Sequence, residues 1–326
     1  MHTSRRNLLK SLLSIAAISA SPQIVRANSP WPNRPIKIIV PVPAGGSLDI
    51  LARTIAKELT SKLGQAVIVE NLPGGGSNIA FTYVAKAAPD GYTLLLGWDS
   101  LAINPGLYPS LPYKLDQFSP ITLAITAPQV LVVGPKLPVK NLKTYIELAR
   151  RSPNEISIAN AGNGSPGHLA AAALESKADI KLTNIPYKGG APAVADLIAG
   201  HVDSLMVTLP AAIQHIRSGK LTALGISSAK RSTGAPEIPT ISEAGLTGYD
   251  LNSWQGFLAP AGTPNEIIRL LNKEIVASLN DPEIKKKLIG EGFEVVASSP
   301  KALGDYLAAS TPKWAKLIKD SGAKVD

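Results

Sequence analysis

Glycine loops carry the residues of this sequence that are best suited to chemistry. They are centred near Gly45, Gly75, Gly164 and Gly189, two in each half of the chain, and each follows a predicted strand and opens a predicted helix. A helix start offers unpaired N–H groups and the positive end of the helix dipole, which attract anions. Glycine also lets a ligand approach the backbone closely. This pattern predicts a carboxylate held from both sides of a cleft.

Small polar side chains strengthen that prediction. Ser47, Ser77, Asn78 and Ser165 add donors beside the loop amides, and His168 lies in the first turn of the helix after the Gly164 loop. His168 is either a ligand donor or a half-buried structural residue. Ser165 and His168 are not a catalytic pair on spacing alone, because triad geometry comes from tertiary structure. An exported hydrolase acting on a carboxylate ester or amide is the alternative to a receptor.

One loop also matches a dinucleotide fingerprint. Residues 162–167 satisfy G-x-G-x-x-G between a predicted strand and a predicted helix. However, the next strand ends at Ile185–Lys188 with no acid to hold a ribose, and Pro166 stiffens the place where a pyrophosphate would lie. We therefore expect no dinucleotide and no other cofactor. The histidines are scattered and lack metal-type spacing, so no metal site is expected.

Composition narrows the class of protein further. The chain has 326 residues, 45% of them hydrophobic, which suffices for two globular domains. Outside residues 1–27 there are 29 basic and 24 acidic residues, a net charge of +5. With 5% aromatic residues, the sequence shows no basic aromatic platform for nucleic acid. The absence of cysteine excludes disulfides, thiolate metal sites and a lipoprotein anchor.

The first residues have the layout of an export signal. Arg5 and Arg6 precede a short apolar stretch, and Val25-Arg26-Ala27 offers a cleavage site. The start resembles the twin-arginine pattern, and an ordinary secretory signal is the alternative. We expect residues 1–27 to be removed and the mature protein to work in the periplasm.

Strands and helices alternate along the mature chain. Alternation of this kind implies parallel sheets covered on both faces. After Tyr249 the chain is expected to be largely helical, and the crossings between two α/β domains are expected near residues 122–128 and 249–256. The predicted strands are the unit 35–41 with its core at 38–40, and 66–70, 93–97, 130–134, 156–160, 204–208 and 223–227. Helices are predicted at 48–63, 142–151, 266–279, 283–288 and 301–319, and after the loops 73–78, 161–167 and 185–190, where they run to residues 86, 177 and 199.

Several longer stretches together resemble one family. The chain is similar, over essentially its whole mature length, to the Bug-type receptors of tripartite tricarboxylate transporters. The stretches that carry the resemblance are residues 31–36, 69–74, 86–94, 159–165, 186–190, 194–200, 258–264 and 321–324.

The resemblance implies a two-domain Venus-flytrap fold with a ligand cleft between the domains. Residues 28–124 and 250–326 would form domain 1, and residues 125–249 domain 2. It also implies a receptor without enzymatic activity, which we expect to be a monomer, that delivers a small organic acid to membrane permease subunits. The residues expected to contact the ligand are Ala44, Gly45, Gly46, Ser47, Ser77, Asn78, Asp99, Ser100, Gly164, Ser165, His168 and Thr208.

Three departures from the family pattern concern the substrate. Val42 stands where an aromatic residue is frequent, Trp98-Asp99-Ser100 where small hydroxyl residues are usual, and Val207-Thr208 in place of an Asp-Asn pair. Asp99 follows a predicted strand, so it is expected either to face the ligand or to cap the next turn. If it faces the ligand, it favours one with an amino or hydroxyl donor, and Trp98 beside it favours an aromatic acid.

Overall fold

The computed structural model describes residues 31–321, and the elements below lie in the compact unit that begins at Arg34. The expected export signal and its cleavage site at Ala27 lie outside the described residues. Within them, the helices are too short or too polar to cross a membrane.

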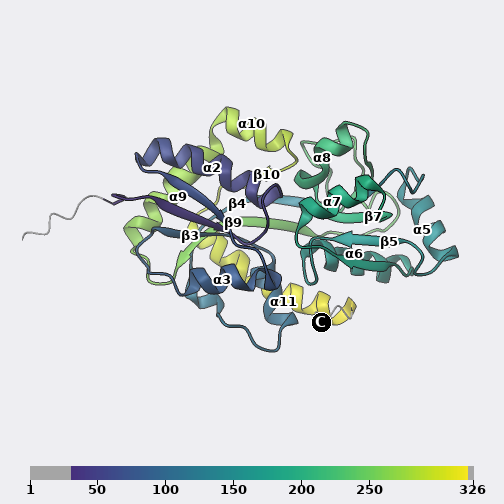
Figure 1. Ribbon diagram of the computed structural model, residues 1–326, viewed down its shortest axis with the longest axis horizontal. Coiled ribbons are helices and arrows are strands. Elements are labelled where there is room, and N and C mark those ends of the chain that lie inside the picture. The colour runs from purple at the N-terminus through teal and green to yellow at the C-terminus, as the bar shows by residue number, and fades with distance from the viewer. Residues whose placement is uncertain (1–30, 322–326) are drawn as a thin grey trace, which may run out of the picture. The chain divides into compact units, whose positions relative to one another are not determined.

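Hydrogen-bonded strands run in the order β2-β1-β3-β9-β4-β7-β5-β6, with β8 and β10 also paired to β4 (Figure 1). The strands are β1 (Ile36–Val40), β2 (Val67–Asn71), β3 (Thr93–Trp98), β4 (Phe118–Val133), β5 (Ser157–Asn160), β6 (Thr183–Pro186), β7 (Ser204–Thr208), β8 (Thr222–Ile226), β9 (Asn252–Pro260) and β10 (Glu294–Val295). We call β1–β3, β9, β10 and the helices on them the first lobe, and β5–β8 with their helices the second lobe.

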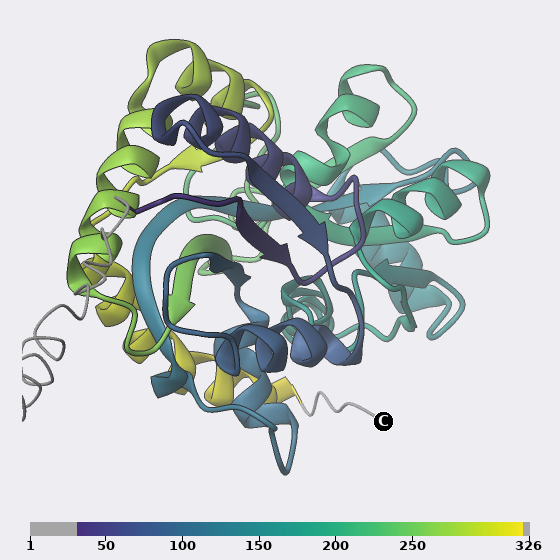
Figure 2. The ribbon, with the colours of Figure 1, turned by 60° about the vertical axis from the view of Figure 1, so that its left-hand side comes forward.

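The long strand β4 belongs to both lobes. Its first part pairs antiparallel with β9 and β10, and its last part, Gln129–Val133, pairs antiparallel with β7 and β8. Figure 2 shows it as a long curved strand beside β9. Thirteen of its sixteen residues are buried, as expected of a strand covered on both faces. The crossings expected between the domains therefore fall on β4 and at the start of β9.

The expectation of purely parallel sheets is wrong at the centre of the molecule. β1–β3 are parallel, and β5 is parallel to β6 and β7, but β9 is antiparallel to both of its neighbours. The stretch after Tyr249 was expected to be helical, yet it contains this buried strand. Its Ser253, Gln255 and Gly256 interrupt the apolar pattern by which a strand is recognised.

The start of β4 was missed for a related reason. Pro120 and Pro128 cannot donate to a ladder and argue against a central strand. The structure accommodates Pro120 beside a register shift in the pairing with β9. Only the apolar end of the strand was predicted.

Helices cover the sheets and follow the expected βα order. Each of β1, β2, β3, β5, β6 and β7 leads into a helix, so these helices begin at the carboxyl ends of strands. The helices are α2 (Ser47–Leu63), α3 (Asn78–Ala85), α4 (Ser100–Leu107), α5 (Leu142–Arg151), α6 (Pro166–Ala178), α7 (Gly190–Ala199), α8 (Leu209–Arg217), α9 (Asn265–Asn280), α10 (Pro282–Gly290) and α11 (Pro300–Ser321). Short 3₁₀ turns lie at Gly75–Ser77 and Leu115–Gln117.

Two apolar clusters form the core of the second lobe. One contains Ile146, Leu174 and Met206, and the other Val194, Leu205 and Ile213. A smaller cluster joins α4 and α11 of the first lobe to Leu169 on α6 of the second lobe. The last helix therefore packs against both lobes.

Candidate ligand-binding cleft

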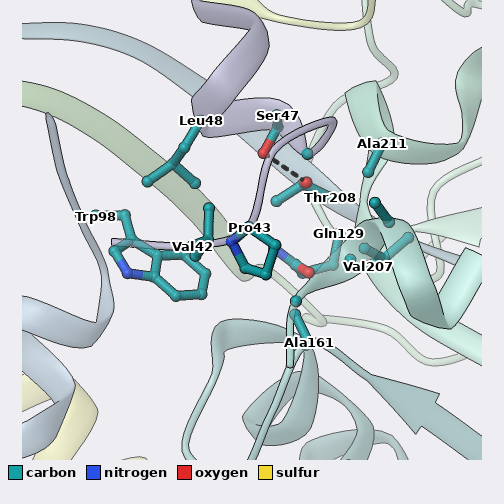
Figure 3. A pocket seen from close by; sticks show the side chains of 15 residues that line it. Val42, Pro43, Ser47, Leu48, Trp98, Gln129, Ala161, Val207, Thr208 and Ala211 are labelled. Carbon is teal, nitrogen blue, oxygen red and sulfur yellow. Dashed lines mark hydrogen bonds between the residues drawn. The ribbon is translucent and has the colours of Figure 1, made fainter. Parts of the chain in front are cut away.

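Two connected spaces lie between the lobes. An outer cleft of about 630 Å³ is lined by the loops after β1, β2, β3, β5 and β6. An inner cavity of about 30 Å³ lies next to it, and five residues line both spaces. Figure 3 shows the side chains that line the inner cavity. These shared residues are Val42, Pro43, Trp98, Ala161 and Gly189. The outer cleft is within the usual size range of a small-molecule site, ~300–1,000 Å³, whereas the inner cavity holds little more than a water or two.

Helix starts dominate the inner cavity. Its lining includes residues from the N-terminal ends of α2, α6, α7 and α8. These positions are Ser47 and Leu48, Gly167, Gly190 and Ala191, and Thr208. The amides of a first helical turn have no partner within the helix, and each helix N-terminus carries about half a positive charge. These helix starts favour an anion at the cavity, and no charged side chain lines it.

Polar side chains connect the lobes at this cavity. Ser47 Oγ accepts hydrogen bonds from Thr208 Oγ1 at 3.0 Å, drawn in Figure 3, and from Gln255 Nε2 at 2.9 Å. Gln129 lines the same cavity, and its Nε2 is buried without a hydrogen-bond partner. The Oε1 atom of Gln255 is likewise buried and unpaired. Buried polar atoms are normally satisfied, so the Gln129 donor remains for a group bound in the cavity, whereas Gln255 is on neither lining.

In the loop around Gly75, the polar side chains form hydrogen bonds to neighbouring protein groups. Ser77 Oγ accepts from Trp98 Nε1 at 3.1 Å and donates to the carbonyl of Pro41 at 3.3 Å. Asn78 Oδ1 accepts from Asn104 Nδ2 and from the Tyr113 hydroxyl. Both side chains therefore hold the loop in place, although Ser77 does line the outer cleft.

The loop around Gly164 is built in a similar way. The Gly164 amide donates to His168 Nδ1 at 3.0 Å, and Ser165 Oγ accepts from the His168 amide as a helix cap. Burial lowers the pKa of His168, so the ring is neutral with its proton on Nε2. Ser165 lines the outer cleft together with residues 161–163.

Six of the twelve residues expected to contact the ligand line these spaces. Gly46, Ser47 and Thr208 line the inner cavity, and Ser77, Ser100 and Ser165 the outer cleft. The other six are Ala44, Gly45, Asn78, Asp99, Gly164 and His168, and neither lining includes them. Gly45 has its amide bound to Asp49 Oδ2 at 3.0 Å, so it stabilises the start of α2 instead.

Asp99 requires the largest correction. Its side chain is fully buried and accepts hydrogen bonds from the Ser253 hydroxyl and from the Trp254 amide on β9. It occupies the N-cap position of α4 but makes no capping hydrogen bond, so it neither lines the cleft nor caps the turn. Burial raises its pKa to about 7 against these hydrogen bonds. Trp98, the last residue of β3, and Ser100, the first residue of α4, line the cleft, whereas the Asp99 side chain between them is held by β9.

Aromatic and proline side chains form much of the outer wall. Trp98, Tyr108 and Tyr187 line the outer cleft with Val42 and several prolines. Tyr187 donates its hydroxyl proton to Asp196 Oδ2 at 2.7 Å, and burial together with this acceptor raises its pKa to about 12. Lys188, an exposed residue, is the only charged side chain on either lining.

Sequence reasoning missed Gln129, Tyr108 and Tyr187 as lining residues. Gln129 lies in β4 directly after Pro128, and Tyr108 ends α4, so no glycine motif marks either position. Tyr187 could have been predicted from the sequence, because it stands two residues before Gly189 in one of the glycine loops. Among residues 31–321, no group of acidic or histidine side chains is arranged to hold a metal ion.

A family model described as tripartite tricarboxylate transporter family receptor matches residues 51–323. The chain belongs to this receptor family. The protein BugT of Bordetella pertussis is 39% identical over 298 residues, which cover 90% of this chain and 91% of the relative. The predicted family is thereby confirmed.

Solved structures of receptors share the fold. The periplasmic binding protein BugD is 36% identical with a TM-score of 0.86, covering 90% of this chain and 99% of its own. An R. palustris protein with adipate is 34% identical with a TM-score of 0.88, covering 90% and 100%. MatC of Rhodopseudomonas palustris, with bound malate, is 31% identical with a TM-score of 0.83, covering 88% and 100%. The chain is therefore a two-domain α/β solute-binding receptor, and the hydrolase alternative is rejected.

Proposed function

We propose that this receptor binds a small organic carboxylate between its two lobes, with the carboxylate group at the inner cavity. The convergence of four helix N-termini on that cavity carries the proposal. Hydrogen bonds to a charged group contribute about 1.5–3 kcal/mol each. A carboxylate there would gain several of them without facing an acidic side chain.

The unpaired Gln129 Nε2 supports the same orientation. It is a donor at a cavity whose other donors are helix amides, so it complements a carboxylate oxygen. The similar receptors with adipate and malate show that this fold accepts carboxylates in at least two relatives.

The experiment compares carboxylic acids with their primary amides. Each pair has the same shape, but only the acid is an anion at pH 7. A ligand at ~100 times its dissociation constant adds about 2.7 kcal/mol to stability. We expect some acids to raise the melting temperature of the purified protein, none of the amides to do so, and the acid to be recovered unchanged. If amides and acids act alike, the inner cavity is not an anion site.

A charge placed at the cavity provides a second test. Gln129→Glu is nearly isosteric and would put a carboxylate where the ligand's is proposed to lie. We expect the affinity for the best acid to fall about 10- to 100-fold. The matched control is Gln214→Glu on α8, where the side chain is exposed and affinity should not change.

We also propose that residues 28–124 with 250–326, and residues 125–249, act as domains that close on the ligand. β4 and β9 are the strands that connect them. A decrease in the radius of gyration on ligand addition, measured by small-angle X-ray scattering, tests this. An unchanged radius would argue for a preformed site.

Delivery to membrane permease subunits of a tripartite tricarboxylate transporter completes the proposal. Membership of the family supports this delivery role. We also propose that the chain is exported through the twin-arginine route, because Arg5 and Arg6 precede its apolar stretch. Replacing Arg5 and Arg6 with lysine should retain the precursor in the cytoplasm. Normal periplasmic yield of that variant would support the general secretory route instead.

A further inference from the structure

The outer cleft differs in chemistry from the inner cavity. We propose that it selects a carboxylate whose remaining part is flat, apolar and uncharged, an aromatic acid above all, and that Trp98 is the specificity-determining side chain. This rests on the proposed function, because it assumes that the ligand's carboxylate lies at the inner cavity.

The position of Trp98 is the first argument. It is the last residue of β3 and lines both the inner cavity and the outer cleft. Figure 3 shows its indole ring beside Val42 and close to Pro43. The part of a ligand that joins its carboxylate to the rest of the molecule therefore lies against the indole.

The orientation of the indole is the second argument. Its Nε1 donates to Ser77 Oγ, and Ser77 in turn donates to the carbonyl of Pro41. The only polar atom of the side chain is thereby used within the first lobe. Trp98 is 7% exposed and lines the cleft, so with its nitrogen paired its ring offers only carbon atoms to a ligand. A flat ligand can stack on such a ring, whereas a charged one loses hydration without gaining a partner.

The rest of the wall has the same character. The residues that surround the outer cleft beside Trp98 include Val42, Pro43, Pro73, Tyr108, Pro186 and Tyr187. The Tyr187 hydroxyl is bound to Asp196, so this ring also offers its apolar part. With Asp99 bound to β9, no acidic side chain on the lining pairs with an ammonium group.

A second carboxylate would meet neutral donors in the outer cleft, such as Ser100, Asn163 and Ser165, but little positive charge. Lys188 is the only cationic side chain on its lining, and it is exposed to solvent. Backbone amides of residues 74–76 are the competing possibility for a distal carboxylate, since these residues also line the cleft. The two possibilities predict opposite preferences between an aromatic monocarboxylate and an aliphatic dicarboxylate.

The test measures affinities by titration calorimetry for 3-phenylpropionate, hexanoate and adipate. We expect the native protein to bind 3-phenylpropionate about tenfold more tightly than adipate, with hexanoate between them. Trp98→Leu should weaken 3-phenylpropionate about tenfold and change adipate by less than twofold. Trp98→Phe retains a flat ring and should restore most of the preference. Trp314→Phe, which alters an indole in the cluster between α4, α6 and α11, is the matched control.

The outcomes separate the two proposals. If adipate binds more tightly than 3-phenylpropionate to the native protein, the outer cleft recognises a second carboxylate and this inference is wrong, while the proposed function stands. The same holds if Trp98→Leu weakens all three acids equally. If none of the carboxylic acids that are compared with their amides binds the protein, the proposed function is wrong and this inference is wrong with it. The affinities of the native protein for 3-phenylpropionate and adipate test the inference by themselves, so it remains testable even if Trp98→Leu folds poorly.

Discussion

The inner cavity and the outer cleft share five lining residues, yet their linings differ in chemistry. The inner cavity is lined by helix starts and by the polar side chains of Ser47, Gln129 and Thr208. The outer cleft is lined by aromatic rings, prolines and loop backbone, together with a few polar side chains such as Ser100, Asn163 and Ser165. We propose that the first holds a carboxylate without a cationic side chain and that the second favours apolar groups. An anion site and a specificity site can therefore be altered separately in one receptor.

Filling the inner cavity should produce the largest effect on binding. Gly46 is buried, yet a Cβ added there would meet no heavy atom within 4 Å, and its φ of −85° and ψ of 175° suit any residue. Gly46→Leu should therefore fold normally and occupy the place of the ligand's carboxylate. We expect a loss of affinity of about 100-fold or more, equivalent to two charge-assisted hydrogen bonds.

The matched control for that variant is Gly290→Leu. Gly290 ends α10, lies outside both linings, and also has open space around an added Cβ. Calorimetry should show native affinity for this control. Comparable losses in both variants would mean that the inner cavity has no special role.

Removing one hydrogen bond between the lobes should have a moderate effect. Thr208→Val keeps the shape of the side chain but loses the bond from Thr208 Oγ1 to Ser47 Oγ. A neutral hydrogen bond contributes about 0.5–1.5 kcal/mol, so affinity should fall about 2- to 10-fold. The loss should appear mainly as faster ligand dissociation in stopped-flow measurements. Unchanged dissociation would show that this contact does not contribute to the ligand-bound state.

Asp99 should have the smallest effect on binding, because its carboxylate lies outside both linings. Asp99→Asn should change the affinity for any of the acids by less than twofold. A large change, or a new preference between mono- and dicarboxylates, would place Asp99 at the ligand after all.

The same variant should change the pH dependence of stability. Burial raises the pKa of Asp99 to about 7 in the folded protein, above its value near 3.8 in the unfolded chain. The folded state therefore binds more protons between these values, and stability falls as the pH rises from about 4 to 7. Each pH unit in that window corresponds to about 1.4 kcal/mol. In chemical denaturation, Asp99→Asn should exceed the native protein in stability by a few kcal/mol at pH 8 and resemble it at pH 4.

Asp49 provides the opposite case in the same lobe. Burial alone would raise its pKa, but hydrogen bonds from Arg53, the Gly45 amide and Asn71 lower it. Its ionised form therefore stabilises the fold above its unfolded pKa, and this contribution is lost as the pH falls. Asp49→Asn should destabilise the protein at pH 8 and have little effect in acid. Parallel behaviour of the two variants would contradict the assigned environments.

The sequence by itself determined the family, the βα order and the positions of the loops. Local patterns are sufficient for these features, because glycine turns and the strand and helix periods act over a few residues. The loops after β1, β2, β5 and β6 were all predicted, and the structure places residues from each of them on the cleft lining. The division at residues 124 and 249 stays a prediction.

The tertiary structure decided which of the loop residues face the ligand site. Asp99 and Trp98 are adjacent in the chain, but the pairing of β3 with β9 brings Ser253 and Trp254 to Asp99 and leaves Trp98 on the cleft. The side chains of His168 and Asn78 likewise accept hydrogen bonds from groups in their own lobes. The outcome for Asp99 depends on Ser253, 154 positions away, and the outcome for Asn78 on Asn104 and Tyr113, which lie beyond β3. Antiparallel β9, interrupted by polar residues and glycine, left no local pattern from which that pairing could be predicted.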